Sequence, residues 1–250
     1  IGEIAQAHLK NKTAKRLKKI MGNEDLAQAS TWDDEVRSDP NYKWLEPFHF
    51  TTVPEGTHYD PNYESNKEAD VVKGIQKQIE ILSHKDSDDK LKVQAIRLLV
   101  HFIGDVHQPL HVGNIGDMGG NLCLVKWHGQ DSNLHRVWDS EMIDKNQLSY
   151  TELAKKLSKV SKQEIKKLQS DDLLTWVYES TQIRKNIYPD EKSKNKQRSD
   201  YCKKSLEDNT LNIKNIPSLS YDYSYKFKSI IEQRLQQAGI RLAGILNNTL

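Results

Sequence analysis

The middle of the chain reads Leu91-Lys-Val-Gln-Ala-Ile-Arg-Leu-Leu-Val-His-Phe-Ile-Gly-Asp-Val-His-Gln-Pro-Leu-His111. This stretch predicts a helix over 91–106, because its apolar residues recur at helical spacing and no proline occurs before Pro109. His101 and Asp105 are four residues apart, which puts both side chains on one face of that helix. The helix therefore presents an imidazole and a carboxylate side by side.

Helical periodicity also dominates the rest of the chain. It predicts further helices over 4–20, 71–82, 150–168, 172–187 and 225–247. Strand signal is confined to 121–127, which follows two glycines and predicts at most a small β-hairpin. No internal repeat or linker divides the chain, so we expect one all-α domain over 1–250.

The composition is that of an ordinary globular protein, with 36% hydrophobic and 29% charged residues. No apolar run approaches the ~20 residues that a membrane-spanning helix needs. The net charge of +2 gives no overall field to attract a polyanion, so nucleic-acid binding must be argued from a local site. Cys123 and Cys202 allow one disulfide at most, and the sequence leaves open whether they lie close enough to form it.

Histidine and aspartate recur at one spacing. The pair His101 and Asp105 is followed by His135 and Asp139, again four residues apart, and His111 lies between the two pairs. Two such ligands on one helical face can hold one cation. Imidazole and carboxylate ligands without cysteine suit a hydrolytic zinc site better than a closed structural site.

Two upstream segments add candidate ligands beside aromatic rings, Trp32-Asp-Asp-Glu35 and Phe48-His-Phe50. Together with the downstream pairs they exceed what one ion requires, which indicates at least two metal ions. A single His-x-x-x-Asp is more often a surface pair or a capped core histidine. Spacing alone therefore leaves a purely structural interpretation open.

Several longer motifs resemble the S1/P1 family of zinc nucleases. They are His101 to His111 as quoted above, Gly119-Gly-Asn121, Asn133-Leu-His-Arg-Val-Trp-Asp-Ser140, Ser30-Thr-Trp-Asp-Asp-Glu-Val-Arg37, Phe48-His-Phe50 and the C-terminal Gly239-Ile-Arg-Leu-Ala-Gly-Ile-Leu-Asn247. They occur in the family's order and at plausible distances. The resemblance covers essentially the whole chain.

The resemblance implies a helical fold shared with bacterial zinc phospholipase C, and a cleft that holds three zinc ions. The matched ligands are Asp34, His49, His101 and Asp105 for one zinc, and His111, His135 and Asp139 for a second. Asp105 is also expected to bridge to a third ion. In the family that ion's other ligands are a tryptophan and a histidine near the mature N-terminus, which we expect to precede Ile1.

The resemblance also implies catalytic roles. Asp34 is expected to orient the attacking water as well as to bind metal. Arg37, one helical turn further on, would donate charge-assisted hydrogen bonds to the phosphate, unless it is a surface arginine paired to a glutamate. Phe50 would stack on an unpaired base, which favours single strands over duplex, unless it belongs to the core. Thr52 stands where the family often has an aspartate, so the base preference stays open.

Two further residues are candidates for orienting ligands or substrate. His107 and Asn133 are both expected to position ligands or the bound phosphate. The basic stretch 192–198 is more readily a solvated loop than a nucleic-acid track. The alternating Tyr221, Tyr223 and Tyr225 are expected in a packed extended segment that leads into the last helix.

We therefore expect a zinc-dependent endonuclease and 3′-nucleotidase that hydrolyses single-stranded RNA and DNA to 5′-phosphate products. It is expected to be secreted or periplasmic after removal of a signal peptide, and to be a monomer without a stable protein partner. One alternative is a zinc phospholipase C, although its last ligand is a glutamate where this chain has Asp139. Another is a metal-binding relative that has lost catalysis, against which the intact Asp34 and Arg37 argue.

Overall fold

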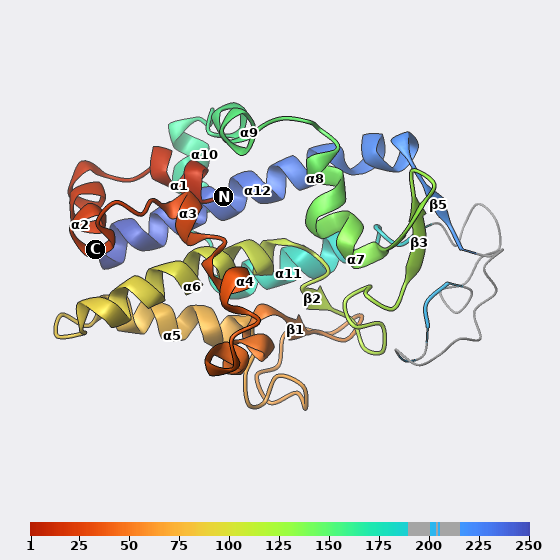
Figure 1. The fold of residues 1–250 in the computed structure, drawn as a ribbon, viewed down its shortest axis with the longest axis horizontal. Coiled ribbons are helices and arrows are strands. Elements are labelled where there is room, and N and C mark those ends of the chain that lie inside the picture. The colour runs from red at the N-terminus through yellow and green to blue at the C-terminus, as the bar shows by residue number, and fades with distance from the viewer. Residues whose placement is uncertain (190–200, 204, 206–215) are drawn as a thin grey trace.

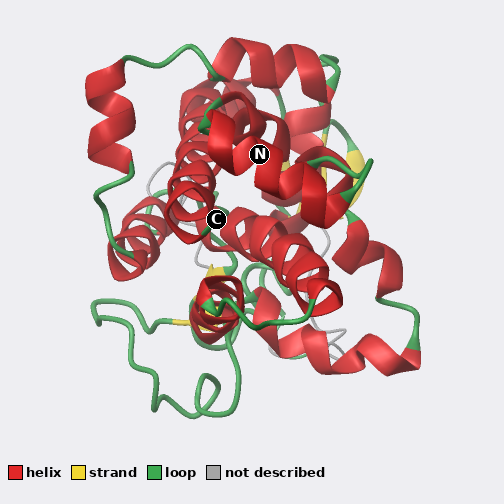
Figure 2. Cartoon of the chain, turned by 90° about the vertical axis from the view of Figure 1, so that its left-hand side faces the viewer, coloured by secondary structure: helices red, strands yellow, loops and turns green. Residues whose placement is uncertain are grey.

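The computed structural model describes residues 1–189, 201–203, 205 and 216–250. Helices make up most of this part of the chain, and its strands are short (Figure 2). The prediction of an all-α fold is therefore confirmed. No helix among the described residues is long and apolar enough to cross a membrane. The stretch 192–198 lies outside the described residues.

The core is built around α6 (Asp89–His107), which packs against α5 (Val71–Ser83), α11 (Leu173–Arg184) and α12 (Tyr221–Thr249) (Figure 1). The helices predicted over 71–82 and 91–106 are thus confirmed. Buried apolar side chains lie on nearly every side of α6, which is typical of a helix at the centre of a core. They include Ala95, Ile96, Leu98, Leu99, Phe102, Ile103 and Val106.

The N-terminal segment forms two helices, α1 (Gly2–Ala7) and α2 (Asn11–Met21), so the single helix predicted over 4–20 is wrong. The break is held by the far end of the chain. Asn247 Oδ1 accepts from the backbone N–H of Lys10 at 2.8 Å, and Asn247 Nδ2 donates to the carbonyl of His8 at 3.1 Å. These bonds satisfy backbone groups that a continuous helix would have used internally.

Three short elements then lead the chain to the end of α6. They are α3 (Leu26–Ala29), α4 (Trp32–Val36) and the 3₁₀ segment η1 (Pro40–His49). Trp32 fixes α4 in place, since its ring lies under the guanidinium of Arg97, 5.1 Å from ring centroid to Cζ, and edge-on to Tyr42 at 5.2 Å.

The helix predicted over 150–168 is also divided, into α9 (Tyr150–Leu157) and α10 (Lys162–Leu168), which lie on the side of α12 away from α5 (Figure 1). Ser161 begins the second helix, because its backbone is extended and its hydroxyl accepts a hydrogen bond from the N–H of Glu164.

The last helix begins earlier than predicted. Tyr221, Tyr223 and Tyr225 belong to the first turns of α12, so the expected extended segment is wrong. Tyr223 is buried there, where its hydroxyl accepts from Trp138 Nε1 at 2.7 Å and donates to the carbonyl of Ile187. This tertiary contact favours the helix over the extended form that the alternating tyrosines suggest.

The predicted hairpin is confirmed as β3 (Leu124–Trp127) paired antiparallel with β4 (Gln130–Asn133), with Val125 opposite Ser132. A third strand, β5 (Ser218–Leu219), adds to β3 in parallel. A disulfide joins Cys123, directly before β3, to Cys202, which answers the question that the sequence left open.

Near the end of α6, β1 (Thr51–Thr52) and β2 (Val112–Gly113) form a two-stranded parallel sheet. After β4 the chain turns through three short helical segments, α7 (Leu134–Arg136), the π-helical η2 (Val137–Glu141) and α8 (Met142–Asp144). Residues of β1, β2, α7, η2 and α8 line one cavity together with residues of the C-terminal end of α6.

Candidate metal centre

An open cavity of about 1150 Å³ lies at the C-terminal end of α6. All of the residues predicted as metal ligands line it, namely Asp34, His49, His101, Asp105, His111, His135 and Asp139. Arg37 and Phe50 line it too. The fold therefore gathers in one cavity the side chains that four separate motifs contribute.

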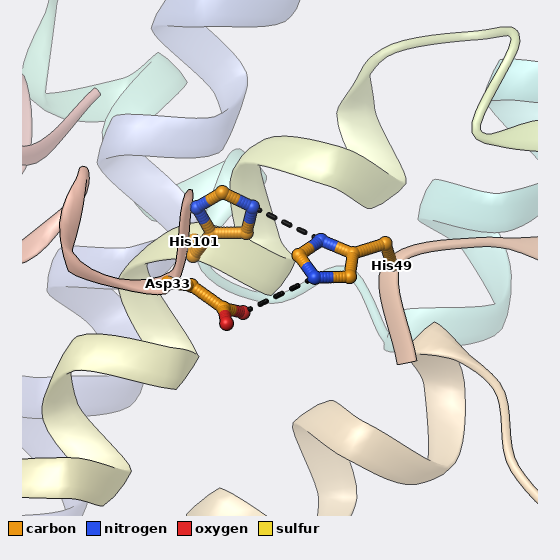
Figure 3. A group of neighbouring side chains, drawn as sticks. All are labelled: Asp33, His49 and His101. Carbon is orange, nitrogen blue, oxygen red and sulfur yellow. Dashed lines mark hydrogen bonds and ion pairs between the residues drawn. The ribbon is translucent and has the colours of Figure 1, made fainter. Parts of the chain in front are cut away.

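One group of side chains converges at the wall formed by α6 and η1. His49 Nδ1 lies 3.1 Å from His101 Nε2 and 3.0 Å from Asp105 Oδ2, and His101 Nε2 lies 3.4 Å from the same Asp105 oxygen. On the other side of the His49 ring, Nε2 lies 3.4 Å from Asp33 Oδ2, as the dashed lines in Figure 3 show. Asp33, His49 and His101 are close enough together to hold an ion.

A second group comes from the segment after α6 and from α7 and η2. His111 Nε2 lies 3.3 Å from Asp139 Oδ1, and His135 Nε2 lies 3.9 Å from Asp139 Oδ2. These three residues are also close enough to hold an ion. Asp105 connects the groups, because its Oδ1 atom lies 3.5 Å from His111 Nδ1 while Oδ2 faces His49 and His101.

Backbone carbonyls fix the rings of three of the four histidines. The Nδ1 atom of His101 lies 3.0 Å from the carbonyl of Ser30, that of His111 lies 2.7 Å from the carbonyl of His49, and that of His135 lies 2.8 Å from the carbonyl of Gly119. A carbonyl can only accept, so Nδ1 carries the proton and Nε2 keeps its lone pair for a cation. The Nε2 atom of His111 is buried and forms no well-directed hydrogen bond, although Asp139 lies nearby.

Gly119 allows one of these contacts. Its φ of +60° lies in the left-handed region, and a Cβ there would lie 2.4 Å from the carbonyl oxygen of Leu110. Only glycine fits without moving that backbone, and the resulting turn aims the Gly119 carbonyl at His135. Gly119 also lines the cavity, so this turn forms part of its wall.

The buried charges in the cavity are strongly coupled. Burial alone would raise the pKa of Asp105, but the neighbouring His101, His111 and His49 outweigh it and lower that pKa below its usual value. Burial alone would lower the pKa of His111, yet the carboxylates of Asp105 and Asp139 raise it to about 9. In the absence of a cation, imidazolium ions thus balance the carboxylates, which indicates a site built to hold positive charge.

The structure places the adjacent carboxylates of α4 differently. Asp33 is buried with its carboxylate toward His49, whereas Asp34 is exposed and lines the cavity. Asp34 is not within the group of Asp33, His49 and His101, although its charge is among those that raise the pKa of His101 against the effect of burial. Its predicted role as a ligand stays a prediction.

Phe50 and Arg37, which were predicted to contact the substrate, are both accessible to solvent. Phe50 is 45% exposed at the end of η1, which excludes the alternative that it belongs to the core. Thr52, Tyr63 and Ser65 line the cavity as well. Arg37 follows α4 directly and is exposed. Both Phe50 and Arg37 are therefore accessible from the cavity, and their contacts with substrate stay predictions.

Asn133 has a different place. Its side-chain oxygen accepts from the backbone N–H of Arg136 at 2.8 Å and so caps α7, the short helix that carries His135. It is not among the described residues that line the cavity. The structure shows a capping role, and the predicted contact with substrate stays a prediction.

His107 lines the cavity and belongs to a buried network, whose other members were not predicted from the sequence. The Nε2 atom of His107 lies 2.9 Å from Arg241 Nη1, and the His107 carbonyl accepts from Arg234 Nε at 2.9 Å. Both arginines also bind the Glu179 carboxylate of α11. Burial and the two arginines lower the pKa of His107 well below its usual value, which keeps the ring neutral. The network ties the end of α6 to α11 and α12.

Comparison with known proteins agrees with this geometry. The family model described as S1/P1 Nuclease matches residues 1–250. Endonuclease 3 of Arabidopsis thaliana is 30% identical over 98% of this chain and 84% of its own length. Nuclease S1 of Aspergillus oryzae is 26% identical over 99% and 88%, and nuclease P1 of Penicillium citrinum is 29% identical over 58% and 56%. The chain therefore belongs to the S1/P1 nuclease family of phosphodiester hydrolases.

Proposed function

We propose that this protein is a zinc-dependent endonuclease and 3′-nucleotidase that cleaves single-stranded RNA and DNA to 5′-phosphate products. The observation that carries the proposal is the Asp105 carboxylate, which directs one oxygen to each of two histidine groups in an open cavity. Two cation sites on either side of one carboxylate are close enough to act on one phosphodiester.

The donor set suits zinc. Imidazole nitrogens and carboxylate oxygens without thiolates are typical of catalytic zinc sites. The backbone carbonyls that fix His101, His111 and His135 support the same assignment, since metal-binding histidines usually donate their other N–H to such a group. Bound zinc would supply a hydroxide nucleophile at neutral pH and would neutralise phosphate charge.

The ligands that we assign are those implied by the family resemblance. Asp34, His49, His101 and Asp105 would hold one zinc, and His111, His135 and Asp139 would hold a second. Asp105 would also contribute to a third ion.

The remaining residues act on the substrate. Asp34, exposed in the cavity, would accept a hydrogen bond from the attacking water and so orient it toward the phosphorus. Arg37 would donate hydrogen bonds to the non-bridging phosphate oxygens, where negative charge grows in the transition state. Phe50 would stack on a base next to the scissile bond. A paired base cannot reach such a ring, which supports single-strand specificity.

We also propose that the protein works outside the cytoplasm, in the secreted or periplasmic space. The disulfide between Cys123 and Cys202 supports this location, because such bonds persist in oxidising compartments. We propose that the protein is a monomer, since all of the assigned ligands line one cavity of a single chain.

The proposal is tested by measuring metal content and hydrolysis on the same sample, prepared with its natural processed N-terminus. We expect about three zinc ions per chain by mass spectrometry, hydrolysis of single-stranded RNA and DNA, and loss of activity with a chelator that zinc restores. H101A should lose zinc and activity, whereas H84A, at an exposed histidine outside the cavity, should keep both.

Fewer than two zinc ions together with no hydrolysis of either polymer would overturn the proposal. The phospholipase alternative is tested in the same assay. Turnover of phosphatidylcholine without turnover of nucleic acid would favour it, but the family match and the nuclease relatives argue against that outcome.

A further inference from the structure

Asp33 is a buried carboxylate that the proposed ligand set does not use. Only 2% of its surface is exposed, and its Oδ2 atom forms no well-directed hydrogen bond. The nearest nitrogen that the structure gives it is Nε2 of His49, 3.4 Å away (Figure 3). An unpaired carboxylate this deep in a protein is costly, so a partner at this position is expected.

His49 is oriented differently from the other three histidines of the centre. They present Nε2 to the cavity and use Nδ1 for a backbone carbonyl. His49 instead directs Nδ1 toward His101 Nε2 at 3.1 Å and toward Asp105 Oδ2 at 3.0 Å. Since Nδ1 and Nε2 lie on different edges of the ring, Nε2 is left facing away from those ligand atoms, and there it meets Asp33.

The chemistry of an imidazole ligand completes the argument. If Nδ1 of His49 offers its lone pair to a cation, Nε2 must carry the proton, and that proton needs an acceptor in the buried wall. Asp33 provides an oxygen where the other three histidines have carbonyls. A carboxylate in this place also makes the imidazole a stronger electron donor than a carbonyl does.

We infer that Asp33 is a positioning residue of the metal centre, which accepts a hydrogen bond from Nε2–H of His49 and so holds Nδ1 toward the cation. This inference rests on the proposed zinc centre and deepens it. Asp33 and Asp34 of α4 then have different roles, one in holding His49 and the other in the cavity. Successive residues of a helix point about 100° apart, so one carboxylate faces the wall and the other faces the cavity.

The inference is tested by comparing D33N and D33A, with D86N as a control at an exposed aspartate outside the cavity. Asparagine keeps an oxygen that can accept the hydrogen bond from His49, but it lacks the negative charge of a carboxylate that binds the ion directly. We expect D33A to weaken zinc binding about 10- to 100-fold in chelator competition, as changes beyond the metal ligands usually do, and D33N to stay within a few-fold of wild type. Circular dichroism should show the same helix content in all three variants.

A second measurement determines which nitrogen of the His49 ring carries the proton. Nitrogen NMR of the zinc-loaded protein, with the His49 signals assigned by their loss in H49A, should show the proton on Nε2 of His49. Equal loss of zinc in D33N and D33A would mean that Asp33 binds the ion directly and would overturn the inference. It is also overturned if D33A binds zinc like wild type, or if the proton of His49 is on Nδ1.

The proposed function is checked separately within this set. Wild type and D86N must bind zinc and cleave single strands, and D34N must lose activity. If those three results hold and the Asp33 results do not, only the inference fails. If wild type binds no zinc, the proposed function and the inference fail together.

Discussion

Replacing Asp105 with alanine should disturb both halves of the metal centre at once. The side chain places Oδ2 3.0 Å from His49 Nδ1 and 3.4 Å from His101 Nε2, and Oδ1 3.5 Å from His111 Nδ1. Asp105 itself is buried at the end of the central helix. D105A therefore removes a proposed ligand of the first zinc, and with it the contact to His111, a proposed ligand of the second.

The loss of stability can be calculated because a bound ion stabilises the folded protein according to its Kd. Changes beyond the direct ligands already weaken metal binding about 10- to 100-fold, so loss of a direct ligand should cost at least about 100-fold. With free zinc at about 1,000 times the wild-type Kd, zinc stabilises the wild type by about 4.1 kcal/mol. The same zinc concentration is only about 10 times the Kd of the variant, which leaves about 1.4 kcal/mol. Zinc-dependent stabilisation should thus fall by about 2.7 kcal/mol.

The assay is thermal unfolding of D105A and wild type, each with zinc and with chelator. For a chain of this size the loss corresponds to a zinc-induced rise in Tm that is smaller by roughly 5–10 °C. Taking the difference between the two conditions removes any effect of the substitution on the metal-free protein. D86N should respond to zinc like wild type. If D105A shows the full zinc-induced rise and keeps hydrolysis, Asp105 is not a ligand of the metal centre and the reasoning is refuted.

Three further predictions concern substrate binding and the fold. R37A should lower kcat about 100- to 1,000-fold with zinc content unchanged, because an arginine at the phosphate acts mainly in the transition state; an unchanged kcat would make Arg37 a surface residue. F50A should raise KM for single-stranded substrates, since stacking is worth about 1–3 kcal/mol per base, and F50W should restore it; KM equal to wild type in F50A would contradict the stacking role. The double variant C123S/C202S should lose up to about 4.5 kcal/mol of unfolding free energy in urea titration, because the bond spans 79 residues and restricts the unfolded chain; a urea midpoint equal to wild type would contradict it.

The central helices could be predicted from the sequence because their signal is local and long. The apolar spacing of 71–82 and 91–106 marks α5 and α6 within a few residues. The break between α1 and α2 could not be predicted in this way, since Asn247 supplies the hydrogen bonds from the other end of the chain. The break between α9 and α10 did carry a local signal, the serine-capped start at Ser161, which the periodicity alone hides.

The sequence predicts which residues meet in the site, but not how their side chains are oriented. The residues that the motifs predict as ligands all line one cavity in the structure. They cannot tell which of Asp33 and Asp34 faces His49, because that depends on how Trp32 and its contacts rotate the short helix α4. The capping role of Asn133 had a readable signal, an asparagine directly before a short helical turn.

The most direct test of the shared metal centre is X-ray diffraction from crystals of the zinc-loaded protein at wavelengths on both sides of the zinc absorption edge. We expect one anomalous peak beside His49, His101 and Asp105, and another beside His111, His135 and Asp139, with the Asp105 carboxylate facing both. Zinc peaks away from Asp105 and from both groups, or no peak at either group in protein that cleaves single strands, would contradict this expectation.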